Sequence, residues 1–237
     1  MRNIGRSIQR REAAFPWFLV STVLPLLVMP FTNLDGNLVQ RLLLPVVVMN
    51  LVAMSLSIVP EHLLRIGRYS LLPTYRVLGF LCAFVMWIPF LLGHHADHRW
   101  HLPILLVVSG FYVATAMIIV QILARVDRVN ERVLCLGAAG YIHLGLTWGQ
   151  LGTTIEILSP GSFSLGHMPA GEELVERMSY FSFVTLGSLG YGDVLPVTAI
   201  AESFTVLLPA ATQDQSPGFF GYASDMALGI PRGILSG

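Results

Sequence analysis

Five long apolar stretches constrain the fold of this chain more than any other feature of its sequence. About 20 predominantly apolar residues in a helix are enough to cross the hydrocarbon core of a bilayer. Backbone at that depth must satisfy its own hydrogen bonds, and a helix does so within one segment. We therefore expect an all-α membrane protein with about five transmembrane helices, at residues 13–32, 41–60, 74–93, 102–124 and 133–158.

The composition favours the same class of protein. Hydrophobic residues make up 54% of the chain and charged residues only 12%, whereas about a quarter of residues are charged in a typical soluble domain. The formal net charge is zero, so we expect the lipid bilayer as the main environment and no nucleic-acid partner. Cys82 and Cys135 lie in or beside apolar stretches, which is typical of buried thiols rather than of a disulfide framework.

The positions of the basic residues predict how the chain is oriented. All fourteen are arginines. Short cytoplasmic loops of membrane proteins collect positive charge, and most of the arginines lie on one side if residues 1–12 are cytoplasmic, whereas Arg41, Arg99 and Arg177 then lie outside. The first apolar stretch is too long for a cleaved signal peptide, and no small-residue cleavage pattern follows it. We therefore expect a multi-pass protein of the cell (inner) membrane with a cytoplasmic N-terminus.

The sequence Ser-Leu-Gly-Tyr-Gly-Asp at Ser188–Asp193 is the most informative motif for function. A dehydrated potassium ion needs a cage of oxygens in place of its water shell, and rings of backbone carbonyls can supply one. All carbonyls must then point to one side, which requires left-handed backbone at intervals. Glycine adopts that conformation without a steric penalty, and Gly190 and Gly192 are spaced for it.

The other residues of this motif have matching roles. We expect the Ser188 hydroxyl to be the innermost ligand, with Leu189 and Tyr191 directed away from the ion. Asp193 places a carboxylate at the mouth, and Thr185 supports the segment from behind. The ion-coordinating residues are therefore predicted to be Ser188, Leu189, Gly190, Tyr191 and Gly192.

Residues 174–198 resemble the pore helix and selectivity filter of bacterial potassium channels. Residues 155–163 are similar to the end of the outer helix and the turret in that family, and the whole similarity covers roughly residues 133–209. In place of the family's usual hydroxyl-bearing lead-in this chain has Gly187 and Ser188, which leaves open whether conduction is selective for potassium.

The resemblance implies passive potassium conduction through a pore, with K⁺ as the permeant ion, no other cofactor and no enzymatic activity. One chain contains one filter motif and a ring needs several, so a homotetramer is implied, four being the number in that family. It also implies a re-entrant pore helix that returns to the outer face of the membrane.

Residues 172–186 are predicted to be this pore helix, with the negative end of its dipole directed toward a cation. Tyr180, Phe181 and Phe183 would form aromatic packing that holds the filter open, although anchoring at the lipid interface is the alternative. Glu156 is expected to accept hydrogen bonds from the outer backbone of the filter, with simple solvation at the interface as its alternative.

Residues 13–132 form a four-helix module before the predicted pore. Voltage sensing needs several arginines within the fourth helix, but residues 102–124 contain no charged residue at all. We therefore expect no voltage sensor of the arginine-ladder type.

In the fifth stretch, Gly145, Gly149 and Gly152 form a small-residue stripe that permits close helix packing. His143 in the same stretch is expected to be a neutral side chain hydrogen-bonded to a neighbouring helix.

The loop before the fourth stretch contains four histidines and one aspartate within residues 94–101. Neutral imidazole is a common ligand of zinc and copper, so His94, His98 and His101 are candidate ligands of a metal. A loop between two spans must be polar in any case, which is the simpler explanation.

The region after the filter does not supply the second long helix that a potassium channel needs. Residues 197–210 form an apolar run of about fourteen residues, too short to span a bilayer, and residues 210–237 are irregular. We expect the inner pore helix to be missing or degraded, as a frameshift or truncation would produce.

Three functional hypotheses stay open. The first is a potassium-selective channel subunit, or a truncated and non-conducting version of one. The second is a non-conducting membrane scaffold or regulatory subunit that assembles with intact channel subunits. The third is a small transporter or membrane enzyme in which the Gly-Tyr-Gly triplet is coincidental; no catalytic triad, metal-protease motif or phosphate loop supports it.

Overall fold

The computed structural model describes residues 11–28, 38–60, 65–66, 69–87, 101–126, 130–166 and 174–213, and the chain is mostly helical. The elements are η1 (Glu12–Ala14), α2 (Phe15–Val28), α3 (Leu38–Ile58), β1 (Arg65–Ile66), β2 (Tyr69–Ser70), α4 (Leu72–Val85), α6 (His101–Leu123), α7 (Glu131–Leu158), β3 (Phe163–Ser164), α8 (Leu174–Leu186), β4 (Leu195–Pro196) and α9 (Ala199–Gln213). Each of the five apolar stretches overlaps one of the helices α2, α3, α4, α6 and α7, so the prediction of a mostly helical chain is confirmed.

The described part of the chain contains one helix that is both long and apolar enough to cross a membrane, at Leu102–Leu123. Shorter apolar helices lie at Glu12–Val28, Pro45–Ile58 and Leu72–Val85. Two of the apolar stretches continue into residues 29–37 and 88–100, which are not described, and α7 is diluted by glycine and polar residues. The structure thus shows a helical bundle, whereas five spans stay a prediction.

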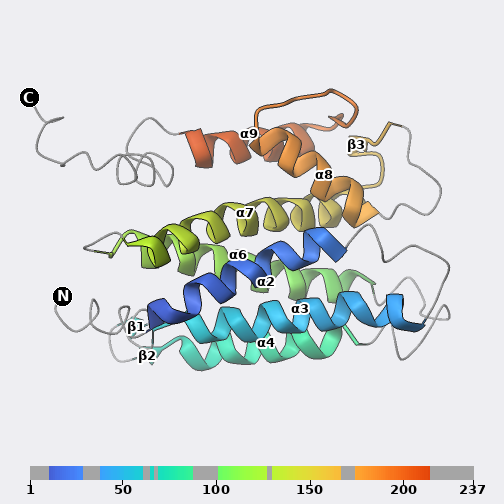
Figure 1. The fold of residues 1–237 in the computed structure, drawn as a ribbon. Coiled ribbons are helices and arrows are strands. Elements are labelled where there is room, and N and C mark those ends of the chain that lie inside the picture. Colours follow the sequence, from blue (N-terminus) through green and yellow to red (C-terminus); the bar gives the residue numbers. More distant parts are fainter. Residues whose placement is uncertain are drawn as a thin grey trace, which may run out of the picture.

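The helices lie lengthwise beside one another (Figure 1). α7 packs against both α2 and α6, α3 packs against α2 and α4, and α4 also packs against α6. One apolar core connects all five helices and includes Phe15 and Phe18 of α2, Leu51 of α3, Phe111 of α6 and Leu136 of α7, each fully buried. The four-helix module is therefore packed directly onto the first helix of the pore-like region.

Polar side chains link these helices inside the core. The Tyr75 hydroxyl of α4 lies 2.9 Å from Thr115 Oγ1 of α6, and Ser109 Oγ of α6 lies 3.0 Å from Thr154 Oγ1 of α7. Each of these hydroxyl groups has another hydroxyl as a hydrogen-bond partner, and buried polar groups generally need such a partner.

The glycine stripe of α7 faces α8, which confirms the packing prediction. A Cβ atom at Gly149 would lie 2.7 Å from the Ser179 Cα, and one at Gly145 would overlap the Phe183 ring. The Ser182 hydroxyl donates a hydrogen bond of 2.7 Å to the Gly145 carbonyl oxygen. Because the glycines on this face of α7 have no Cβ atom, the backbones of α7 and α8 can approach each other closely.

The segment after α8 returns to the end of the bundle where α7 finishes (Figure 1). There β4 pairs antiparallel with β3, with Phe163 opposite Pro196 and Ser164 opposite Leu195. This two-residue pairing was not anticipated from the sequence, because such short strands have no periodicity. The pairing brings the residues before and after α8 side by side.

A helix does begin where the inner pore helix was expected to be missing. α9 has 15 residues, about 22 Å at the usual rise per residue, which is less than the roughly 30 Å of a bilayer core. It is attached to α7 by Trp148, whose Nε1 donates to the Phe204 carbonyl oxygen at 3.4 Å and whose ring stacks on Phe204. The described part of the chain thus has a helix at this place, and residues 214–237 lie outside the described residues.

Candidate functional site

The backbone of the predicted filter alternates between two conformations. Ser188, Gly190 and Gly192 have φ values of 57°, 56° and 73°, while Leu189 and Tyr191 between them do not enter the left-handed region. Ser188 is the only non-glycine residue with positive φ in the part of the chain that the structure describes. An ordinary strand has negative φ at every residue, so the positive φ at every second residue distinguishes this segment from a strand.

The amide groups at the start of this segment are tied to the end of α8. The backbone N–H of Gly187 donates to Phe183 O at 2.9 Å, and that of Leu189 donates to Val184 O at 2.9 Å. The Ser188 N–H donates to the carbonyl of Thr185 at 3.0 Å, so Thr185 supports the segment through its backbone. Because the N–H and C=O of a trans peptide point in opposite directions, the carbonyls of Gly187 and Ser188 are directed away from the end of α8.

The middle of the segment is uncovered in a single chain. The side chains of Leu189 and Tyr191 are 59% and 65% exposed, and no described atom lies within 4 Å of a Cβ placed on Gly190 or Gly192. After the segment in the chain, Val194 is buried in a small core with Phe163, Met178, Phe181 and Ala201. The segment is therefore anchored at both ends and open along its length.

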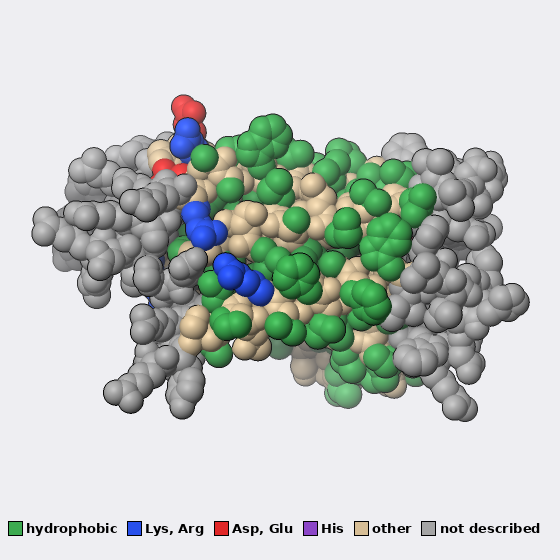
Figure 2. Space-filling view, turned by 90° about the horizontal axis from the view of Figure 1, so that it is seen from below, with side chains coloured by type: hydrophobic (Ala, Val, Ile, Leu, Met, Phe, Trp, Pro, Cys, Tyr) green, Lys and Arg blue, Asp and Glu red, His purple; other side chains and the backbone are tan. Residues whose placement is uncertain are grey.

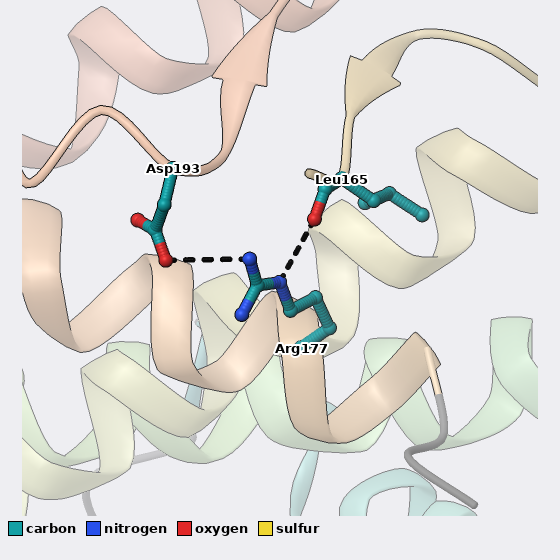
Figure 3. A network of polar contacts seen from close by, with 3 residues as sticks. All are labelled: Leu165, Arg177 and Asp193. Carbon is teal, nitrogen blue, oxygen red and sulfur yellow. Dashed lines mark hydrogen bonds and ion pairs between the residues drawn. The ribbon is translucent and has the colours of Figure 1, made fainter. Parts of the chain in front are cut away.

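The outer end of the segment is held by an arginine of α8 (Figure 3). Arg177 Nη2 lies 3.3 Å from Asp193 Oδ2, and Arg177 Nε donates to the Leu165 carbonyl oxygen at 3.0 Å. The guanidinium also lies over the Tyr180 ring, 5.3 Å from its centroid. Partial desolvation and then a hydrogen bond donated to Asp193 raise the pKa of the Tyr180 phenol. Tyr180 and Asp193 thus lie together at the outer end of the segment, and their roles at the mouth of a filter stay a prediction.

The expected partners of Glu156 are wrong. Its two carboxylate oxygens accept hydrogen bonds from the backbone N–H groups of Gly161 at 2.7 Å and Phe163 at 2.9 Å, which belong to the turn after α7. The carboxylate closes this turn because Gly161 and Phe163 turn back over the end of α7. Since Phe163 pairs with Pro196, Glu156 supports the region beyond the filter indirectly.

The aromatic residues of α8 pack in different directions. Phe181 is buried and contacts Phe163 edge to face, with ring centroids 5.6 Å apart. Phe183 packs against Gly145 of α7. These two rings therefore brace α8 against the turn and α7, behind the filter segment rather than beside it.

His143 is buried as a neutral hydrogen-bonded side chain, as expected. Its Nε2 lies 3.1 Å from the Tyr112 carbonyl oxygen of α6, and its ring stacks on that of Tyr112. A carbonyl can only accept, so Nε2 carries the hydrogen.

The predicted metal ligands are not tested by the structure. His94 and His98 lie outside the described residues, and His101 begins α6 with a side chain that is not described. Within the described ranges no three histidine, cysteine or acidic side chains lie close enough to hold a metal ion.

Arg177 is the residue that sequence reasoning missed. The positive-charge pattern places it only among the outer arginines, although it is the only arginine or lysine between Arg132 and Arg232. Its isolation within an apolar region is the sequence signal that could have identified it.

No family model, curated protein or solved structure matches the chain. The residues of the chain and their geometry alone bear on its function.

Proposed function

We propose that this chain is a subunit of a potassium-selective channel, in which Ser188–Gly192 line the path of the ion. The observation that carries this proposal is the left-handed backbone at every second residue, directly after a helix that ends at Leu186. A row of carbonyls on one side of such a segment can replace the hydration shell of a cation. A simple turn needs at most one or two left-handed residues in a row, not three at alternate positions.

The helix before the segment favours a cation at its end. α8 ends at Leu186, and the last carbonyls of a helix have a partial negative charge. The Gly187 and Leu189 amides satisfy two of these carbonyls, while the axis of the helix still directs its negative end toward the start of the segment. A cation on the inner side of Ser188 would therefore be stabilised.

The uncovered side chains support assembly from several copies. One chain supplies only one row of carbonyls, and a cage needs oxygens from more than one direction. Leu189 and Tyr191 are large, apolar and exposed in the single chain. In a homotetramer these side chains would pack between neighbouring subunits while the carbonyls face the common axis.

The outer surface of the bundle supports placement in a bilayer. On α4 the exposed residues Val77, Phe80, Leu81 and Phe84 recur at helical spacing, and contiguous apolar surface of this kind is rare on soluble monomers. Figure 2 shows hydrophobic side chains over the middle of one face and basic side chains gathered toward one end. A multi-pass protein of the cell membrane with a cytoplasmic N-terminus fits this distribution.

A second candidate function follows from the length of α9. At 15 residues, α9 is shorter than the roughly 20 residues that cross a bilayer. A subunit with a filter but a short inner helix would assemble with longer channel subunits and regulate them without conducting alone. Flux through the purified chain separates the two candidates.

The test is flux of K⁺ and Na⁺ through proteoliposomes that contain the purified chain. We expect K⁺ flux to exceed Na⁺ flux, and Gly190→Ala to abolish it, because φ at this position is 56° and a Cβ disfavours that conformation. Gly161→Ala is the matched control, since φ there is 85° and nothing lies within 4 Å of the added Cβ, but the residue is outside the filter segment.

Three outcomes of this flux experiment are distinct. K⁺ flux that is lost in Gly190→Ala and retained in Gly161→Ala supports the channel. Equal flux in both variants contradicts the role of the segment. No flux through the wild-type chain, with restored selective flux when it is mixed with intact channel subunits, favours the regulatory function.

A further inference from the structure

Arg177 joins three segments that are distant in the sequence. It lies in the first turn of α8, its Nη2 contacts the Asp193 carboxylate at 3.3 Å, and its Nε donates to the Leu165 carbonyl at 3.0 Å. Its side chain is only 11% exposed, although arginine normally keeps its charge in water. One guanidinium thus holds the helix, the strand-like turn and the mouth of the filter together (Figure 3).

The backbone around this arginine is closely packed as well. Gly166, next to Leu165, has a φ of 62°, and a Cβ there would overlap the Asp193 carbonyl oxygen and lie 3.3 Å from Arg177 Nη2. The turn and the mouth therefore approach each other to a distance that only glycine permits. This contact differs from an ordinary surface ion pair, which contributes little to stability, because the guanidinium also donates a hydrogen bond to the Leu165 carbonyl and lies over the Tyr180 ring.

The two ends of the filter segment are restrained by different means. At the inner end, backbone amides of residues 187–189 are bonded to the last turn of α8. At the outer end, the contact between Asp193 and Arg177 ties the segment to the same helix. A row of carbonyls binds a cation tightly only if it is held in the binding shape before the ion arrives, so the outer tie bears directly on ion affinity.

We propose that Arg177 is a positioning residue that holds the outer half of the filter in its potassium-binding shape by fixing Asp193 against the Leu165 turn. This role rests on the channel function proposed above. Arg177 does not touch the ion, and it acts through Asp193. A substitution that breaks the contact between Arg177 and Asp193 therefore leaves the fold of the bundle intact and lowers the affinity of the filter for K⁺.

The test measures how K⁺ stabilises the full chain, since a ligand that binds only the folded state raises its melting temperature. Thermal unfolding of the purified chain in nanodiscs is followed as KCl replaces NaCl at constant ionic strength. We expect Arg177→Gln to raise the half-saturating K⁺ concentration by about tenfold, within the range of typical coupling between sites. Arg76→Gln on the exposed side of α4 is the matched control and should leave it unchanged.

Further variants separate positioning from general destabilisation. Arg177→Lys keeps the charge but not the forked geometry, so it should restore part of the affinity. Asp193→Asn should reproduce the effect of Arg177→Gln, and the double variant should be no worse than either single variant, because residues that act through one contact are not additive. If Arg177→Gln does not fold, the Arg177→Lys and Asp193→Asn variants still measure the shift.

The outcomes distinguish this inference from the function on which it rests. If the wild-type chain is stabilised by K⁺ over Na⁺ and the variants of Arg177 and Asp193 keep the wild-type half-saturating concentration, the positioning role is overturned alone. Additive effects in the double variant overturn it too. A wild-type chain that K⁺ and Na⁺ stabilise equally overturns the proposed function and this inference together.

Discussion

Ser188 has the least favourable backbone of the residues in the filter segment. Its φ of 57° places a non-glycine residue in the left-handed region, which costs roughly 1–2 kcal/mol. Such strain persists where the surroundings impose it and often marks a functional position. Here the Ser188 N–H is bonded to Thr185 O, and the side chain contributes the hydroxyl that we expect to be the innermost ion ligand.

Ser188→Gly therefore has two effects of opposite sign. Relief of the strained φ should stabilise the fold by roughly 1 kcal/mol in Na⁺, while loss of the hydroxyl should weaken K⁺ binding. Ser188→Ala keeps the strain and loses only the hydroxyl, which makes it the matched control. Unfolding in NaCl and in KCl measures both effects, and a Ser188→Gly variant with undiminished K⁺ stabilisation would contradict the ligand role.

The glycine spacing at this scale could be predicted from the sequence, because left-handed positions are chemically distinctive. The partners of long side chains could not. The Glu156 carboxylate reaches Gly161 and Phe163 because of how the turn after α7 folds. Likewise, Arg177 reaches Asp193 only because α8 and the return loop lie together. Contacts between distant segments depend on tertiary packing, which no local pattern encodes.

At the scale of elements, the contact between α7 and α8 positions the filter segment. Apolar length predicted the positions of the helices, although α4 ends at Val85 and the predicted stretch continues to residue 93. The glycine stripe predicted that α7 has a close neighbour. It did not identify that neighbour as α8, because spacing on one helix defines a face but not the helix that covers it. The pairing of β3 with β4 and the 15-residue α9 likewise depend on contacts beyond the local sequence.

Gly149→Ala tests this contact. A Cβ at Gly149 would lie 2.7 Å from the Ser179 Cα, so the helices must move apart, and overpacking of this kind typically costs about 1–3 kcal/mol. Gly137→Ala on the same helix meets nothing within 4 Å and should be neutral or slightly stabilising. Thermal unfolding in detergent compares the two, and equal stability of both variants would show that α7 and α8 are not packed this closely.

At the scale of the whole molecule, two of the groups of exposed apolar residues bear on function. The stripe on α4 faces outward from the bundle, where lipid would cover it. Leu189 and Tyr191, by contrast, are exposed between the left-handed residues of the segment, where the proposed channel function would have neighbouring copies cover them. The expected number of copies rests on the resemblance to potassium channels, and the expectation of more than one rests on the proposed function, since one segment supplies one row of carbonyls.

The most direct test is to locate ions in the assembled protein. We would determine the structure of the full chain in Rb⁺, a potassium substitute with a usable anomalous signal, and again in Na⁺. The channel account predicts a row of Rb⁺ peaks on a fourfold axis, lined by carbonyls of Ser188–Gly192 from four copies, and no such row in Na⁺. Carbonyls that face the protein interior, or Rb⁺ absent from this segment in the assembled protein, would contradict it.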